Sequence, residues 1–173
     1  MGRQIILLGT DHALQEAEKR GGNIVDPDFR ELVEQLANEF SVDFIFEEAS
    51  NLGPTFAEKF AAKKLGPDRY RDVDPSRESR QELNLLPDAE EAYWIGRPNL
   101  DTCHWGSARQ QLLDVHGGRE ELWLQALKAR DFSNALMIIG QAHLLSFGFR
   151  LKSEEFDVRG YCYMPYALLA RGA

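Results

Sequence analysis

Hydrophobic residues in this chain gather in short continuous runs, each followed by glycine or polar residues. Two of these runs, residues 5–8 and 136–139, lie near opposite ends of the chain, and each leads into a Gly-x-x-His sequence. An uninterrupted apolar run of this length is typical of a strand buried on both faces, as in a parallel sheet covered by helices. In open α/β sheets, ligands bind at the carboxyl ends of the strands. The pattern therefore predicts that the two histidines stand at a functional edge.

The other apolar runs alternate with segments whose apolar residues recur at helical spacing. Strands are predicted near residues 5–8, 42–46, 70–73, 135–139 and 156–163, and helices near residues 27–40, 54–65, 77–85, 119–129 and 141–152. Asp26 followed by Pro27 is a typical helix start. The alternation predicts one α/β domain over residues 1–173, with a mainly parallel sheet flanked by helices. The last strand is open to an antiparallel position at the edge of that sheet.

The pattern loosens over residues 87–118. A helical piece near residues 89–95 is followed by Gly96-Arg97-Pro98 and by an irregular stretch that includes Cys103-His104-Trp105-Gly106. Loops of this length inside compact domains are typically functional. We interpret this segment as a lid or insertion over the edge of the sheet that carries the histidines.

Composition narrows the partners that the chain is expected to bind. The 173 residues are 43% hydrophobic and 28% charged, as in soluble globular domains, and the formal net charge is −8. A nucleic-acid binder needs a basic footprint, which this balance does not favour. No apolar run approaches the roughly 20 residues needed to span a bilayer. The two cysteines are too few for a disulfide scaffold, so a cytoplasmic location without membrane contact is the default expectation.

Polar side chains follow four of the predicted strands, and together they suggest a metal site. They are His12, the pair Glu47 and Glu48, Asp74 and His143. Two imidazoles and a carboxylate suit a divalent metal such as Mn, Co or Zn and leave open positions for water and substrate. We therefore predict His12, His143 and Glu47 as metal ligands. Side chains alternate along a strand, so one of the two glutamates is expected to face the site, and the sequence leaves open which one.

Further residues are candidates for catalysis or for contact with substrate. Glu48, Glu47 or His12 could act as a general base on water, and Arg119 could stabilise a developing oxyanion. Substrate contacts are predicted at strand ends and at the last strand, from Asp11, Asp74, Arg77 and Tyr163. Turn formation is the structural alternative for Asp11, and helix capping is the alternative for Asp74 and Arg77.

The two motifs, Gly9-Thr10-Asp11-His12 and Gly140-Gln141-Ala142-His143, resemble a known superfamily when they are taken with the glutamates between them. That superfamily includes erythromycin esterases, ChaN haem-binding lipoproteins and TraB/Tiki proteins. The second motif continues with leucine, as in the Gly-x-x-His-Leu of TraB-like sequences. The stretch Arg119-Glu120-Glu121-Leu122-Trp123 is similar to the arginine-led helix that approaches the site in this superfamily. The resemblance implies a catalytic or ligand-binding cleft built from the histidines and a glutamate.

Members of this superfamily differ in activity, and three hypotheses follow. Tiki members are metal-dependent proteases, the esterases hydrolyse a macrolide ester, and ChaN binds haem. The leading hypothesis is a metal-dependent hydrolase of amide or ester bonds, with a peptide substrate slightly preferred over another small molecule. The alternatives are a non-catalytic haem- or metal-binding protein and a metal-independent esterase with His12 as general base. A homo-oligomer is compatible with each of them.

Overall fold

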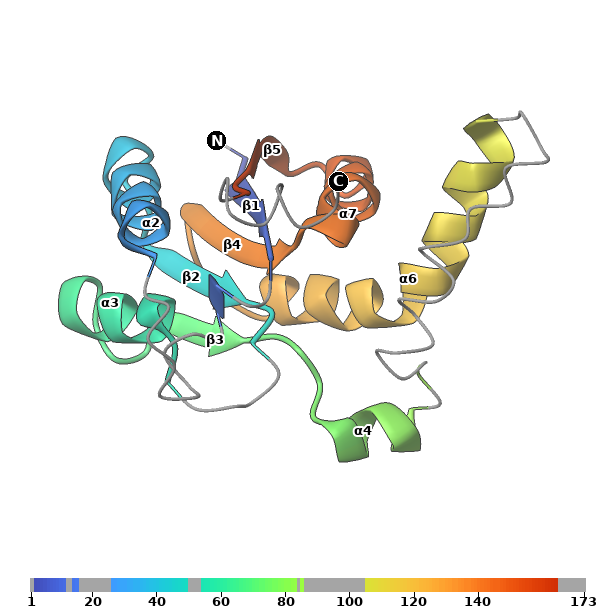
Figure 1. The fold of residues 1–173 in the computed structure, drawn as a ribbon, viewed down its shortest axis with the longest axis horizontal. Helices are drawn as coiled ribbons and strands as arrows, with labels where there is room; N and C mark the ends of the chain where they lie inside the picture. The colour runs from blue at the N-terminus through green and yellow to red at the C-terminus, as the bar shows by residue number, and fades with distance from the viewer. Residues whose placement is uncertain are drawn as a thin grey trace.

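The computed structural model of the protein describes residues 2–11, 14–15, 26–49, 54–83, 85 and 105–164, with the backbone alone at Arg77 and at residues 105–116. Within these residues five strands form one sheet (Figure 1). The strands are β1 (Gln4–Thr10), β2 (Phe44–Glu47), β3 (Tyr70–Asp72), β4 (Asn134–Gly140) and β5 (Asp157–Cys162). Their order is β3-β2-β4-β1-β5, and every pairing is parallel. The predicted α/β fold is confirmed, and the last strand is parallel to β1 rather than antiparallel.

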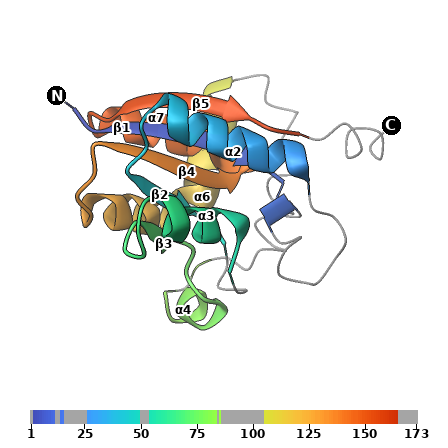
Figure 2. The same ribbon diagram turned by 90° about the vertical axis from the view of Figure 1, so that its left-hand side faces the viewer.

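Helices cover both faces of this sheet (Figures 1 and 2). One face carries α2 (Pro27–Glu39) and α3 (Phe56–Lys64), and the other carries α6 (Trp105–Lys128) and α7 (Leu144–Ser153). The short helix α4 (Arg77–Glu82) follows β3, and a 3-10 turn, η1 (Gln141–His143), joins β4 to α7. None of the described helices is both long enough and apolar enough to cross a membrane.

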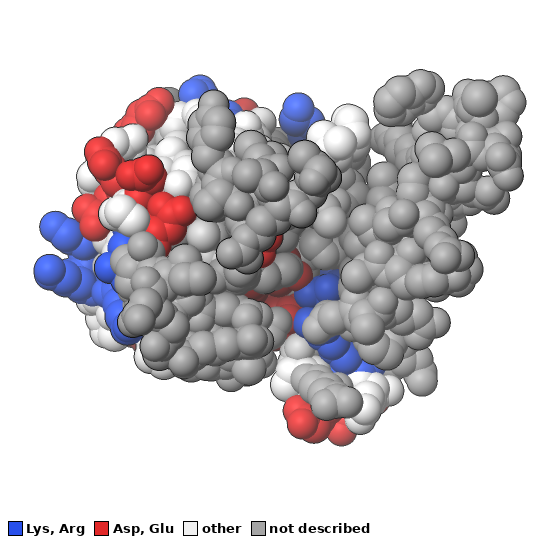
Figure 3. Space-filling view, in the orientation of Figure 1, with Lys and Arg blue, Asp and Glu red and all other residues white. Residues whose placement is uncertain are grey.

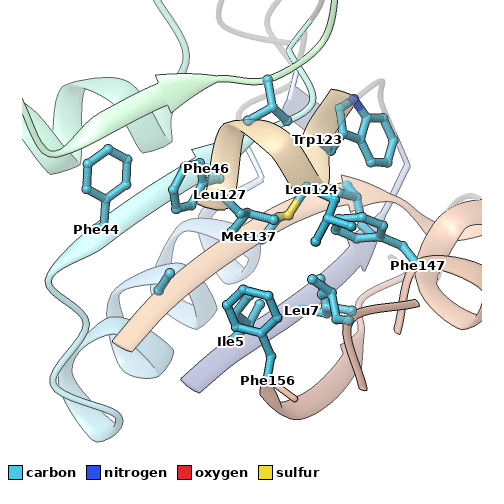
Figure 4. Packing of buried hydrophobic residues seen from close by; sticks show 14 of the residues in the cluster. Ile5, Leu7, Phe44, Phe46, Trp123, Leu124, Leu127, Met137, Phe147 and Phe156 are labelled. Carbon is cyan, nitrogen blue, oxygen red and sulfur yellow. The ribbon is translucent and has the colours of Figure 1, made fainter. Parts of the chain in front are cut away.

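The alternation of side chains along β1 and β4 produces two separate cores. Ile5 and Leu7 pack toward α6 and α7, whereas Ile6 and Leu8 pack toward α2 and α3. Figure 4 shows the first of these cores, in which Trp123 of α6 and Phe147 of α7 lie over the sheet. Both faces exclude water, so the central positions of these strands, residues 5–8 and 135–139, are apolar, which is the reason for the continuous hydrophobic runs.

Three of the helix starts follow the expected capping chemistry. The Asp26 side chain accepts hydrogen bonds from the backbone N–H groups of Asp28 and Phe29, and Pro27 occupies the first helical position. Thr55 caps α3 and Ser76 caps α4 in the same way. A side-chain oxygen at this position satisfies backbone donors that have no partner within the helix. The predicted starts of α2 and α4 are therefore confirmed, and α3 begins two residues after Pro54.

The start of α6 differs from the prediction. The sequence suggested irregular structure around Trp105 and Gly106 and a helix near Arg119, but α6 begins at Trp105 and continues through Gly117 and Gly118. A Cβ atom on Gly118 would lie 2.5 Å from Cδ2 of Leu85, so glycine permits a close approach there. The interpretation of residues 105–118 as irregular was wrong because a glycine pair was taken as a helix break. Glycine lowers helix propensity by only about 1 kcal/mol relative to alanine, which tertiary packing can offset.

Candidate functional site

A group of charged side chains is buried beyond the carboxyl ends of β2, β3 and β4. Each of them exposes less than a tenth of its surface; they are Glu48, Asp74, Arg80, Arg119, Glu120 and His143. Figure 3 shows acidic and basic side chains meeting near the middle of this face of the molecule. Removing charges from water is costly, and ion pairing compensates for that cost only where the geometry is good. The contacts within this buried cluster therefore decide what it can do.

Arg119 joins the ends of two strands. Its Nη2 donates to Oε1 of Glu48, which follows β2, and to Oδ1 of Asp74, which follows β3, at 2.8 Å. The second oxygen of Asp74 accepts from Nη2 of Arg80 in α4. Asp74 therefore binds two guanidinium groups, and the ion pairs form a chain from Arg80 to Glu48.

Glu48 also contacts the end of β4. Its Oε2 accepts a hydrogen bond from the backbone N–H of Gly140 at 2.7 Å, so both of its oxygens have donors. The backbone N–H of Glu48 donates to Ile138 in the same strand. These bonds fix the carboxylate beside the second Gly-x-x-His motif.

His143 lies between two carboxylates. Its Nδ1 is 3.2 Å from Oε1 of Glu120, and its Nε2 is 3.8 Å from Oε1 of Glu48. A carboxylate beside Nδ1 favours a proton on that nitrogen, because a carboxylate only accepts hydrogen bonds. Nε2 then carries the lone pair. The imidazole is therefore oriented as a base or as a ligand, directed toward Glu48.

Packing holds the imidazole ring in this position. The ring lies edge-on to Trp123, with centroids 4.7 Å apart, and both side chains are buried. Gly9, the first residue of the other motif, lies against the start of α7, where a Cβ atom would be 3.2 Å from Cδ2 of Leu144. The two motifs thus meet, and glycine in the first allows the helical turn of the second to pack against β1.

Glu47 belongs to a different set of contacts. Its Oε1 accepts from Nε2 of Gln15 at 3.2 Å, and its Oε2 accepts from the hydroxyl of Thr55 and from that of Tyr70 at 2.9 Å. Ile45, two residues earlier on the same side of β2, packs toward α2 and α3. Burial, followed by the negative charge of Glu47, raises the pKa of Tyr70 well above its ordinary value. The described donors to Glu47 are thus neutral groups, and they lie on the side of the sheet away from α6 and α7.

The structure brings together four of the predicted site residues, Glu48, Asp74, Arg119 and His143. Glu47 faces away from them. Tyr163 lies at the start of α2, where its hydroxyl donates to Asp26 at 3.0 Å, and partial burial with this bond raises the pKa of Tyr163 to about 12.

The other predicted site residues are Asp11, Arg77 and His12. The backbone carbonyl of Asp11 accepts from the backbone N–H of Leu14, a contact that does not involve the side chain, so the substrate contact predicted for Asp11 stays a prediction. Arg77 begins α4, where Ser76 supplies the cap. His12 lies outside the described residues, as does most of the predicted lid.

The sequence interpretation missed Arg80 and Glu120 as members of the buried cluster. A signal for Glu120 was present, because Trp123, Leu124 and Leu127 follow it at the spacing of one helix face. A carboxylate in line with such an apolar stripe is expected to be buried with partners. For Arg80, on the short helix α4, the pattern offered no comparable signal.

Among the described residues, no three His, Cys, Asp or Glu side chains come together in a way that could hold a metal ion. No family model, curated protein or solved structure that was compared with the chain matches it. The resemblance to the esterase, ChaN and TraB/Tiki superfamily therefore stays a prediction based on short motifs.

Proposed function

We propose that the chain hydrolyses an ester or amide bond of a small molecule or peptide, with His143, Glu48 and Arg119 at the reacting centre. One observation carries the proposal: the His143 imidazole has Nδ1 beside a buried carboxylate and Nε2 directed toward Glu48 at the carboxyl edge of the sheet. An imidazole held at one nitrogen by a carboxylate is the usual arrangement of a general base.

In the proposed reaction, His143 activates a water molecule. Nε2 and Oε1 of Glu48 are 3.8 Å apart, too far for a direct hydrogen bond but close enough for one water to contact both. As the water oxygen attacks the carbonyl carbon of the substrate, its proton moves to Nε2. The same proton then passes to the leaving oxygen or nitrogen as the bond to carbon breaks.

Arg119 is proposed to stabilise the oxyanion that develops on the carbonyl oxygen. Its guanidinium group is held by Glu48 and Asp74, so its position is set before substrate arrives. A donor fixed in advance stabilises developing charge more effectively than water, because it does not have to reorient during the reaction.

The donor chemistry of the site favours hydrolysis without a metal. Glu47, a predicted ligand, already accepts three hydrogen bonds, and it faces the α2 and α3 side of the sheet. The oxygen of Glu48 nearest His143 accepts from Arg119, whose positive charge opposes a second cation there. These residues fit a metal poorly, so the proposed mechanism uses none, and His12 is tested as a second base.

The test is hydrolysis by the purified chain of nitrophenyl esters and fluorogenic peptide amides, before and after dialysis against a chelator. We expect activity that survives chelation and falls about 100-fold or more in His143→Asn. Arg150→Met is the matched control, because Arg150 pairs only at the surface with Glu121 among the contacts that the structure describes. His12→Asn, measured beside it, shows whether a second imidazole contributes.

Three results would contradict the proposal. If the chain turned over none of the substrates, the hydrolase proposal would be wrong. Activity restored only by added Mn, Co or Zn would favour the metal-dependent form. A Soret band on addition of haem, without turnover, would favour the haem-binding alternative.

A further inference from the structure

We infer that Glu120 is the positioning residue of the site, holding His143 in the tautomer with its proton on Nδ1. This inference rests on the proposed function. Glu120 is fully buried in α6, one helical turn before Trp123, and its Oε1 is 3.2 Å from Nδ1. Through this contact α6 sets which nitrogen of the imidazole is left to act on water.

Ser146 provides a second contact to the carboxylate of Glu120. Its hydroxyl donates to Oε1 of Glu120, the same oxygen that contacts His143. Ser146 lies in the first turn of α7, three residues after His143, so the imidazole and the hydroxyl approach Glu120 from one short segment. Two donors on one oxygen define the position of that oxygen more closely than either would alone.

The second oxygen of Glu120 indicates that this carboxylate is not there to tie the fold together. Oε2 is buried and has no hydrogen-bond partner among the described residues. Leaving a buried carboxylate oxygen without a donor costs free energy. Glu47, in contrast, uses both oxygens and three donors. A buried carboxylate whose described contacts, with His143 and Ser146, are all made by one oxygen is better explained by what it does to His143.

The charges of the cluster support the same role. Its described members include three carboxylates, Glu48, Asp74 and Glu120, and two guanidinium groups, Arg80 and Arg119. The ion pairs link Glu48 and Asp74 to the arginines, whereas the carboxylate of Glu120 lies beside the imidazole of His143. Glu120 thus stabilises the imidazolium that forms when water is deprotonated.

The test reads the tautomer directly, by nitrogen-15 NMR of the imidazole in the labelled full chain. His143 is assigned by the signals that disappear in His143→Gln, since the chain has four histidines. We expect neutral His143 to carry its proton on Nδ1 in the wild type and in Ser146→Ala. In Glu120→Gln the amide can donate to Nδ1, so the proton is expected to move to Nε2.

Kinetics separate positioning from a general structural effect. In Glu120→Gln, kcat is expected to fall about 100-fold, while KM changes by less than about threefold. Glu120→Asp keeps the carboxylate and is expected to recover part of kcat together with the Nδ1–H tautomer. Glu121→Gln is the matched control, because Glu121 is the exposed neighbour on α6 and pairs with Arg150.

A proton on Nε2 in the wild type would overturn the inference, even if the chain proves to be a hydrolase. An unchanged tautomer and an unchanged kcat in Glu120→Gln would overturn it as well. If Glu120→Gln does not fold, the wild type and Glu120→Asp decide the question by their tautomers. If His143 carries its proton on Nδ1 but the chain turns over no substrate, the proposed hydrolase function is wrong. The tautomer assigned to Glu120 then stands, but its catalytic role does not.

Discussion

Glu47 and Glu48 are neighbours in the chain and equally buried, at 1% exposure each, yet they stand in opposite surroundings. Glu47 accepts from an amide and two hydroxyls, all of them neutral. Glu48 accepts from the Arg119 guanidinium and a backbone N–H, and lies 3.8 Å from the His143 imidazole. The alternation of side chains at the end of β2 sends one carboxylate to each side of the sheet.

The difference in described partners is the reason for proposing Glu48, and not Glu47, at the reacting centre. The donors to Glu47 come from three separate segments, at Gln15, at the cap of α3 and at β3, so Glu47 ties these segments to the end of β2. The side-chain partners of Glu48 are groups that carry charge or can exchange a proton. Ionisable groups buried together in this way mark a candidate functional site.

The largest expected effect on stability comes from breaking the ion pairs of Arg119 with Glu48 and Asp74. Arg119→Met leaves Glu48 and Asp74 without the guanidinium that they share, and breaking a buried pair in this way costs about 3–5 kcal/mol in the free energy of unfolding. Urea unfolding measures it. Arg150→Met removes an exposed pair and is expected to cost less than about 1 kcal/mol. Equal losses in the two variants would mean that the buried pairs do not hold this edge of the sheet.

A second variant pair compares the two carboxylates in activity. Glu48→Gln removes the charge beside His143 and is expected to lower kcat/KM about 100-fold, because the charged acceptor beside the attacking water becomes a neutral amide. Glu47→Gln is expected to lower it less than about tenfold, since its neighbours are hydroxyl and amide donors. Steady-state rates on the best substrate give both values. If Glu47→Gln lowered kcat/KM more than Glu48→Gln does, the reacting centre would lie on the Glu47 side of the sheet and the proposal would be wrong.

A smaller effect is expected at Thr55. Thr55→Ala removes both the cap on the backbone N–H of Glu58 and the hydroxyl that donates to Glu47, at a cost of about 2 kcal/mol in the free energy of unfolding. Thr55→Ser keeps the hydroxyl and should cost much less. Chemical denaturation of the two variants measures the difference. If Thr55→Ala were as stable as Thr55→Ser, the hydrogen bonds around Glu47 would not tie β2 to α3.

The smallest effect concerns pH. The raised pKa of Tyr70 means that the folded chain keeps a proton which the unfolded chain releases above about pH 10. Its contribution to stability is therefore complete below pH 10 and is lost as pH rises above that value. The loss is at most about 1.4 kcal/mol per pH unit. Unfolding measured from pH 9 to 11.5 should show a shallower slope in Tyr70→Phe, and identical slopes would contradict the hydrogen bond to Glu47.

The sequence predicted the elements of the fold better than the membership of the site. Continuous apolar runs indicate strands that are buried on both faces, and local chemistry predicts the helix caps at Asp26 and Ser76. The strand ends at Glu48, Asp74 and His143 were found for the same reason. Arg80 was missed because it lies on a short helix whose approach to the sheet depends on contacts far away in the sequence. Glu120 was missed although its place in the apolar stripe of α6 indicated that it is buried.

The sequence alone indicated a mainly parallel sheet with polar groups at the ends of its strands, because burial on both faces produces continuous apolar runs. Only the structure showed that the last strand is parallel as well. Tertiary structure decided which of Glu47 and Glu48 faces Arg119 and His143, since that depends on where α6 and α3 dock on the sheet. It also decided the partner of His143. Glu120 is 23 residues away in the chain and reaches Nδ1 only because α6 and η1 pack together at the carboxyl end of β4.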